Sequence, residues 1–159
     1  MPLPHSLGDL TPREAVADAV YRALSGFDHN DVEIFTSAFA KEDVTMELRD
    51  GNNTPPFQGF SAIRTNVFGF VSTLETTHMT SNIRVHIKDS MSASLTAQVS
   101  AQHAPAGKGK DGQGPKYLVG AEYEMDLIKD ETDGLWKIKK WIVEILWADG
   151  DASVMAPPN

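Results

Sequence analysis

The sequence contains no cysteine, no long apolar run and little basic charge, and each shortage excludes a class of function. Without cysteine there is no disulfide, no zinc–thiolate site and no thiol nucleophile. No stretch approaches the run of about 18 apolar residues that a transmembrane helix requires, and the N-terminus lacks the basic and apolar regions of a signal peptide. We therefore expect a cytoplasmic protein without a membrane partner.

The charge balance also disfavours nucleic acid as a partner. The 159 residues include 14 Lys and Arg against 22 Asp and Glu, which gives a formal net charge of −8. Binding to a phosphate backbone needs a basic face, and basic residues gather only at 137–140. Length and composition fit one globular domain with its own core. We place this domain at 11–149, between an N-terminal tail at 1–10 and a flexible C-terminal tail at 150–159.

Hydrophobic periodicity predicts helices in the first half of the chain and strands in the second. Apolar residues recur at helical spacing in three segments, 12–26, 31–40 and 60–74. Alternating patterns predict strands at 44–48, 79–88, 92–103, 117–129 and 135–147. This order indicates an α+β fold, a cone-shaped α+β barrel with three N-terminal helices packed on a strongly curved, mostly antiparallel sheet. The interior of such a cone is a natural pocket for a small hydrophobic substrate.

Two of the five histidines, His78 and His103, are the strongest candidates for chemistry. His78 lies just before the strand predicted at 79–88, and His103 ends the apolar face of the next strand. If the two strands form a hairpin, opposite residues have numbers that sum to about 180, so the two imidazoles are neighbours. A histidine pair can move a proton near neutral pH. The alternative is that both residues merely cap strand ends.

Asp28 is the expected third member of this group. An aspartate between the first two predicted helices is a typical N-cap for the second one. A cap carboxylate can also accept a hydrogen bond from a histidine and set its tautomer, so both roles remain open. No HxH or HxxxH pair supports a metal site, and the glycine-rich loop at 104–115 leads into a strand rather than a helix. We expect neither a metal nor a cofactor.

The later strands are expected to supply an apolar pocket wall. In the last strand, alternation puts Trp141, Val143, Ile145 and Trp147 on one face. If Lys129 pairs with Leu135, Tyr123 lies opposite Trp141 and its hydroxyl is a polar group inside the cone. A plain core tyrosine is the alternative. His86, Glu122 and Glu124 are expected on the outer face of the sheet, either as solvated surface residues or as part of a homodimer interface.

Several of these segments together resemble one family. The segments FDHNDVEIF and TTHMTSN, the histidine that closes the following strand and the ending DGLWKIKKWIVEILW are similar to the SnoaL-like branch of the nuclear transport factor 2-like superfamily, and within it to scytalone dehydratase. The resemblance covers roughly residues 10–150. It implies a cone whose fungal dehydratases, isomerases and cyclases use no cofactor, with His78 and His103 as acid–base residues and Asp28 as their support.

One departure from that pattern bears on the substrate. Two tyrosines that hold a catalytic water in scytalone dehydratase fall on Phe27 and Leu48, which cannot donate a hydrogen bond. Scytalone is therefore not the expected substrate. The resemblance implies a cofactor-independent lyase or isomerase that acts on a hydrophobic, oxygenated polyketide or meroterpenoid intermediate of secondary metabolism. We expect the substrate to contact Phe27, Leu48, Phe70, Tyr123, Trp141 and Val143.

In the expected mechanism, His78 removes a proton beside a carbonyl while Asp28 orients its ring. His103 and Tyr123 hydrogen-bond the developing enolate or the leaving hydroxyl. The alternative function is a non-catalytic binding or dimerisation module of the same fold. Epoxide hydrolysis is less favoured, because Arg84, expected on a middle strand, has no acidic residue two positions away.

Overall fold

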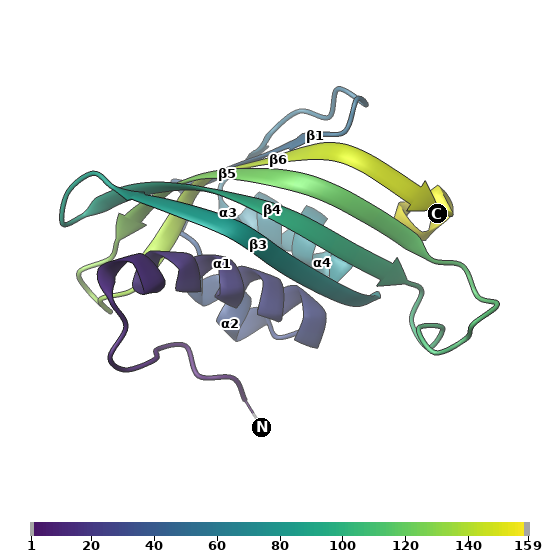
Figure 1. Cartoon of the computed structure of the whole chain (residues 1–159), viewed down its shortest axis with the longest axis horizontal. Helices are drawn as coiled ribbons and strands as arrows, with labels where there is room; N and C mark the ends of the chain where they lie inside the picture. The colour runs from purple at the N-terminus through teal and green to yellow at the C-terminus, as the bar shows by residue number, and fades with distance from the viewer. Residues whose placement is uncertain (1, 158–159) are drawn as a thin grey trace.

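The computed structural model describes residues 2–157 and shows a layer of helices under one face of a curved sheet (Figure 1). The helical layer contains α1 (Pro12–His29), α2 (Val32–Ser37) and a third helix in three parts, α3 (Phe60–Ile63), the π-helical turn η1 (Arg64–Phe68) and α4 (Gly69–Val71). The strands are β1 (Thr45–Arg49), β2 (Phe57–Gln58), β3 (Glu75–Ile87), β4 (Ser92–Ala104), β5 (Tyr117–Lys129) and β6 (Trp136–Gly150).

The six strands form one open sheet in the order β2-β1-β6-β5-β4-β3. All neighbouring pairs are antiparallel except β1 and β6, which run parallel. Strands β2 and β3 are the two edges, and the sheet arches over the helices (Figure 1). The predicted cone-like α+β fold is confirmed, with one more strand than the five expected. None of the helices in the described part of the chain is long and apolar enough to span a bilayer.

An aromatic cluster fills the space between the helices and the sheet. Phe35 of α2 is fully buried, and its ring centroid lies 4.8 Å from that of Phe27 and 4.7 Å from those of Phe39 and Phe68. Each such pair adds about 0.5–1.5 kcal/mol beyond the burial of its area. The cluster therefore holds the end of α1, where Phe27 lies, against α2 and the third helix.

The first helix is longer than its sequence pattern predicted. It begins at a capping box on Thr11 and ends at His29 rather than near Gly26, and Asn30 closes it in a left-handed conformation with a φ of 50°. Gly26 lies inside the helix, and Phe35 packs directly on its backbone. A Cβ at Gly26 would lie 2.6 Å from the Cβ of Phe35. The glycine therefore permits close helix packing and does not end the helix.

The pairing of β5 with β6 differs from the predicted register. Tyr123 lies opposite Val143, and the prediction that it faces Trp141 directly was wrong. A bulge close to the hairpin end of the two strands shifts the partners. Tyr123 and Trp141 nevertheless point to the same face, and their rings meet edge to face with centroids 5.0 Å apart.

A second irregularity in the same pair reverses the orientation of Trp147. Ala121 pairs with Ile145 but Gly120 pairs with Trp147, so Leu146 is the extra residue of a bulge. Trp147 therefore shares the outer face with Gly120, and the prediction that it lies on the inner face was wrong. Its indole covers the glycine so closely that a Cβ at Gly120 would lie 2.1 Å from the ring.

The segment expected to be a flexible C-terminal tail contains the short 3-10 helix η2 (Ala152–Met155). The side chain of Asp151 caps it by accepting a hydrogen bond from the backbone N–H of Ser153 at 2.9 Å. Val154 is buried, and η2 packs against β4 and β5. The segment Ala152–Met155 near the end of the described chain thus packs on the sheet.

Candidate active site

The structure brings Asp28, His78 and His103 together from three separate elements. Asp28 lies in the last turn of α1, His78 near the start of β3 and His103 near the end of β4. The Nδ1 atom of His78 lies 2.6 Å from Oδ1 of Asp28. The backbone N–H of His78 donates to the other carboxylate oxygen at 2.9 Å, and the Thr76 hydroxyl donates to Oδ1 at 2.7 Å. Asp28 thus accepts three hydrogen bonds from β3.

Asp28 does not cap the second helix, so that part of the prediction was wrong. Asp31 is the N-cap of α2, and its Oδ1 accepts from the backbone N–H groups of Glu33 and Ile34. Because α1 continues through His29, the carboxylate of Asp28 points to β3 instead. Thr76 was missed because the strand was predicted to begin at 79. Its position two residues before His78 places both side chains on one face.

The surroundings of Asp28 favour its charged form. Burial alone opposes ionisation, but the hydrogen bonds and positive potential from His78, together with the Thr76 hydroxyl, outweigh it and lower the pKa of Asp28. The carboxylate is therefore an acceptor near neutral pH. It follows that the proton in the Asp28–His78 hydrogen bond belongs to Nδ1 of His78.

The two histidine rings are neighbours. Their centroids lie 5.6 Å apart and the rings meet edge to face. In the β3–β4 pairing, His78 lies opposite Ala101 and His103 opposite Thr76, close to the predicted register. His103 is only 5% exposed, and its Nδ1 lies 3.1 Å from the backbone carbonyl oxygen of Tyr117. Burial lowers the pKa of His103, although the bond to Tyr117 opposes this effect.

Phe27 supports His78 from the helical side. The two rings stack with centroids 5.6 Å apart, and Phe68 of η1 also stacks on Phe27, with a centroid distance of 6.1 Å. Phe27 is buried. Phe70 of α4, two residues after Phe68, is only partly buried. Phe27 thus lies beside His78, while its contact with a substrate stays a prediction.

The predicted wall residues form a row across the inner face of the sheet. Leu48 of β1 pairs with Val143 of β6, which in turn pairs with Tyr123 of β5. Tyr123 is 5% exposed. Burial, helped by the negative charge of Asp28, raises the pKa of its hydroxyl, so this group remains a hydrogen-bond donor.

Trp141 adds a donor that has no acceptor. Its indole nitrogen is enclosed and has no hydrogen-bond partner among residues 2–157. The ring packs between Phe39 and Tyr123, with centroid distances of 6.0 and 5.0 Å. An unpaired buried donor of this kind is stabilised when a ligand or a water molecule supplies a hydrogen-bond acceptor.

The inner face becomes more accessible toward the histidine end of the sheet. Along β5, Met125 and Tyr123 are buried, whereas Val119 and Tyr117 are partly exposed. Along β6, Trp141 is buried and Ile145 is partly exposed. Tyr117 pairs with His103, so the exposed end is the one that holds the histidines. Along β5 and β6, the inner face is therefore least enclosed at the end that holds the histidines.

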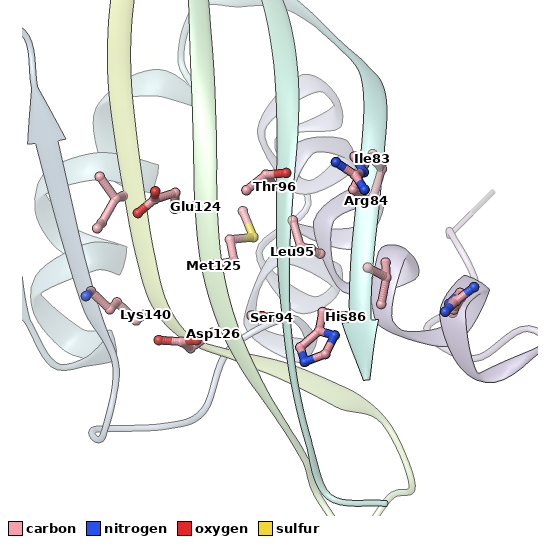
Figure 2. Close-up of a pocket in the computed structure, with 13 residues that line it drawn as sticks. Ile83, Arg84, His86, Ser94, Leu95, Thr96, Glu124, Met125, Asp126 and Lys140 are labelled. Atoms are coloured by element: carbon pink, nitrogen blue, oxygen red, sulfur yellow. The ribbon is translucent and has the colours of Figure 1, made fainter. Parts of the chain in front are cut away.

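A separate groove of about 730 Å³ lies on the outer face of the sheet (Figure 2). Its charged lining includes Arg84 and His86 from β3, Glu124 and Asp126 from β5 and Lys140 from β6. Arg84 lies on an edge strand, so its expected place on a middle strand was wrong. None of these groups belongs to the histidine site. Within the described residues, no cluster of three His, Asp or Glu side chains is arranged to hold a metal ion.

Comparison with known proteins identifies the family. The family model described as a SnoaL-like domain matches residues 8–142. The chain belongs to the SnoaL-like family. Among the proteins similar to it is terrestric acid biosynthesis cluster protein E of Penicillium crustosum. The two are 35% identical over 145 residues, which is 91% of this chain and 90% of the relative.

Solved structures share the fold of this SnoaL-like protein at low sequence identity. A candidate scytalone dehydratase from Novosphingobium aromaticivorans superposes with a TM-score of 0.71 at 19% identity, over 86% of this chain and 85% of the other. Hexachlorocyclohexane dehydrochlorinase LinA-type3 from Novosphingobium barchaimii gives a TM-score of 0.67 at 16% identity, over 92% and 94% of the two chains. At these identities the similarity establishes a common fold.

Proposed function

We propose that this SnoaL-like protein is a cofactor-independent lyase or isomerase that uses His78 as a general base. The observation that carries the proposal is the 2.6 Å contact between Nδ1 of His78 and the Asp28 carboxylate. This contact assigns the Nδ1 proton to the hydrogen bond and leaves the lone pair of the neutral ring on Nε2. A histidine in this state can accept a proton from a bound substrate.

The proposed reaction begins at a C–H bond beside a carbonyl group. The C–H proton moves to Nε2 of His78, and the carbon's electron pair forms an enolate. The Asp28 carboxylate stabilises the resulting imidazolium, and the Tyr123 hydroxyl is a donor for the enolate oxygen. His78 then returns the proton to another carbon, which completes an isomerisation, or to a departing hydroxyl group, which releases water. General base catalysis of this kind contributes about 10²- to 10⁴-fold in rate.

We propose a hydrophobic, oxygenated polyketide or meroterpenoid intermediate as the substrate. The aromatic cluster and the row of Leu48, Val143 and Tyr123 offer mainly apolar contacts, which fits such a molecule. The Penicillium crustosum relative, named for a biosynthesis cluster, supports a place in secondary metabolism. The absence of a hydroxyl on Phe27 and Leu48 leaves fewer polar contacts than in scytalone dehydratase.

Hydrogen exchange of a ketone probe tests the general base. We expect the protein to accelerate exchange of the α-hydrogens of 2-tetralone in D₂O, followed by proton NMR. The variant His78→Ala should lose about 10²- to 10⁴-fold of this acceleration, and Asp28→Asn should lose a smaller part. His86→Ala is the matched control, because His86 is exposed on the outer face of the same strand. Exchange at the wild-type rate in His78→Ala would remove His78 as the base.

The same experiment separates catalysis from simple binding. With a binding module of this fold, the NMR signals of 2-tetralone or those of the protein would shift on mixing, but exchange of the α-hydrogens would not be accelerated. Phe27 and Leu48 favour that alternative, because neither can supply the polar group that a dehydratase would use at its position. Binding without exchange in the wild-type protein would therefore establish the binding function instead.

A further inference from the structure

Both site histidines use the same ring nitrogen, Nδ1, for their side-chain hydrogen bond to the rest of the protein. His78 uses Nδ1 toward the Asp28 carboxylate, and His103 uses Nδ1 toward the backbone carbonyl oxygen of Tyr117 at 3.1 Å. A carbonyl oxygen has lone pairs and no proton, so it can only accept. The Nδ1 atom of His103 must therefore carry the hydrogen. In a neutral ring, Nε2 of His103 then holds a lone pair.

The surroundings keep His103 in its neutral form. The side chain is almost fully buried, and burial lowers its pKa because the charged imidazolium loses hydration. No side chain or backbone group within residues 2–157 donates a hydrogen bond to Nε2 of either histidine. Among residues 2–157, the indole nitrogen of Trp141 is the only side-chain nitrogen or oxygen that is both enclosed and without a hydrogen-bond partner, so neither Nε2 atom is enclosed. Both Nε2 atoms therefore border open space.

The positions of the strands place this lone pair next to His78. Strand β4 lies between β5, which carries Tyr117, and β3, which carries His78. With Nδ1 directed to β5, the opposite edge of the His103 ring is directed toward the β3 side, where the His78 ring lies at 5.6 Å. Two lone pairs do not bond to one another. A ligand that contacts both Nε2 atoms must supply the hydrogens.

We propose that Nε2 of His103 accepts a hydrogen bond from a substrate hydroxyl, so that the site selects molecules in which an O–H group lies near the C–H bond attacked by His78. This substrate class rests on the proposed function, whereas the tautomer of His103 does not. The role differs from the expected one, in which His103 donates to an enolate or leaving group. Tyr123 remains the donor for that purpose.

The tautomer is measured directly by long-range ¹H–¹⁵N correlation NMR of the imidazole rings at neutral pH. We expect His103 to show a protonated Nδ1 and an unprotonated Nε2, with its signals assigned by their loss in His103→Asn. A protonated Nε2 in His103 would overturn the proposal. This result is independent of any turnover, so it stands or falls separately from the role of His78 as a base.

The acceptor role is tested with 2-naphthol and 2-methoxynaphthalene, which differ in the O–H hydrogen. We expect 2-naphthol to bind about five- to tenfold more tightly, the effect of one hydrogen bond, and to shift the Nε2 signal of His103. His103→Asn keeps a donor for the Tyr117 carbonyl and should lose the preference. His86→Asn, at an exposed histidine on the outer face of β3, is the control and should retain the preference.

Three results would overturn the acceptor role. They are equal affinity of the wild-type protein for the two probes, an unchanged preference in His103→Asn, and no change in the His103 signal with either probe at millimolar concentration. A thermal melt of each variant confirms that it is folded. If the preference holds while 2-tetralone exchange is absent, the hydroxyl site remains and the catalytic proposal fails.

Discussion

At the scale of single residues, the chemistry depends on which histidine atoms the protein already occupies. Asp28 and the Tyr117 carbonyl each accept a hydrogen bond from one histidine Nδ1–H, so each ring in its neutral form presents a basic Nε2. The partner of His78 is a carboxylate, whereas the partner of the buried His103 is a neutral carbonyl. Two residues of the same type thus acquire different roles from their partners.

The buried state of His103 predicts a specific pH dependence of stability. Its pKa in the folded protein lies below the ordinary value of 6.5, so the unfolded chain binds a proton more readily. The free energy of unfolding therefore falls as the pH drops below 6.5 and is unaffected by this group above that value. Urea unfolding of the wild type should show this loss, and His103→Asn should show less of it. If the free energy of unfolding depended on pH in the same way in both proteins, the result would contradict the prediction.

At the scale of elements, Arg22 joins α1 to the helix and strand that surround the site. Its side chain is 2% exposed. Nε donates to Asp18 at 2.8 Å, Nη1 donates to the backbone carbonyl of Ser37, and Nη2 donates to the carbonyl of Trp136 at 2.6 Å. One guanidinium thus holds α1, the end of α2 and the start of β6. Phe27 and Asp28 follow on the same helix.

Replacement of Arg22 by Met should therefore lower stability strongly. The change leaves Asp18 as a buried charge without its partner, together with two unpaired carbonyl groups, and such a loss costs roughly 3–5 kcal/mol. The free energy of unfolding in urea measures it. Arg13→Met, on the exposed first turn of the same helix, is the control and should change stability by less than about 0.5 kcal/mol. Equal effects of the two variants would show that the buried contacts contribute little.

At the scale of the whole molecule, the outer face of the sheet carries an exposed apolar patch formed by Met79, Leu146 and Trp147, which are 50%, 54% and 51% exposed. They line a hollow of about 420 Å³ together with Gly120. The charges beside the patch are divided by strand. Arg84 lies on β3 and Lys88 directly follows this strand, whereas Glu122 and Glu124 lie on β5. A twofold axis through this face would bring basic and acidic strands together.

We propose that a second copy of the chain covers this face. Sedimentation of the wild type should then give the mass of two chains, each of 17.4 kDa. The double variant Leu146→Ser, Trp147→Ser should give a single chain, because it removes the apolar contact. Tyr21→Ser, at an exposed aromatic residue of α1, should leave the mass unchanged. A wild-type protein that sediments as a single chain at all tested concentrations would contradict the proposal.

The sequence by itself determined features that depend on neighbouring residues. Alternation along β4 indicated that His103 points to the core side, and the short β3–β4 turn set a register that places the two histidine rings together. Periodicity predicted the helices, the strands and the curved α+β fold. Such patterns are local, because each residue's face follows from the geometry of its own helix or strand.

The tertiary structure alone decided features that depend on distant contacts. Phe35 packs on Gly26, which lets α1 continue and directs Asp28 to His78 instead of capping α2. Bulges between β5 and β6 shift Tyr123 away from Trp141 and turn Trp147 outward, since one extra residue reverses the faces that follow. The Tyr117 carbonyl that sets the His103 tautomer is a backbone atom common to every residue. No sequence pattern marks it, so only the paired strands bring it within reach of the ring.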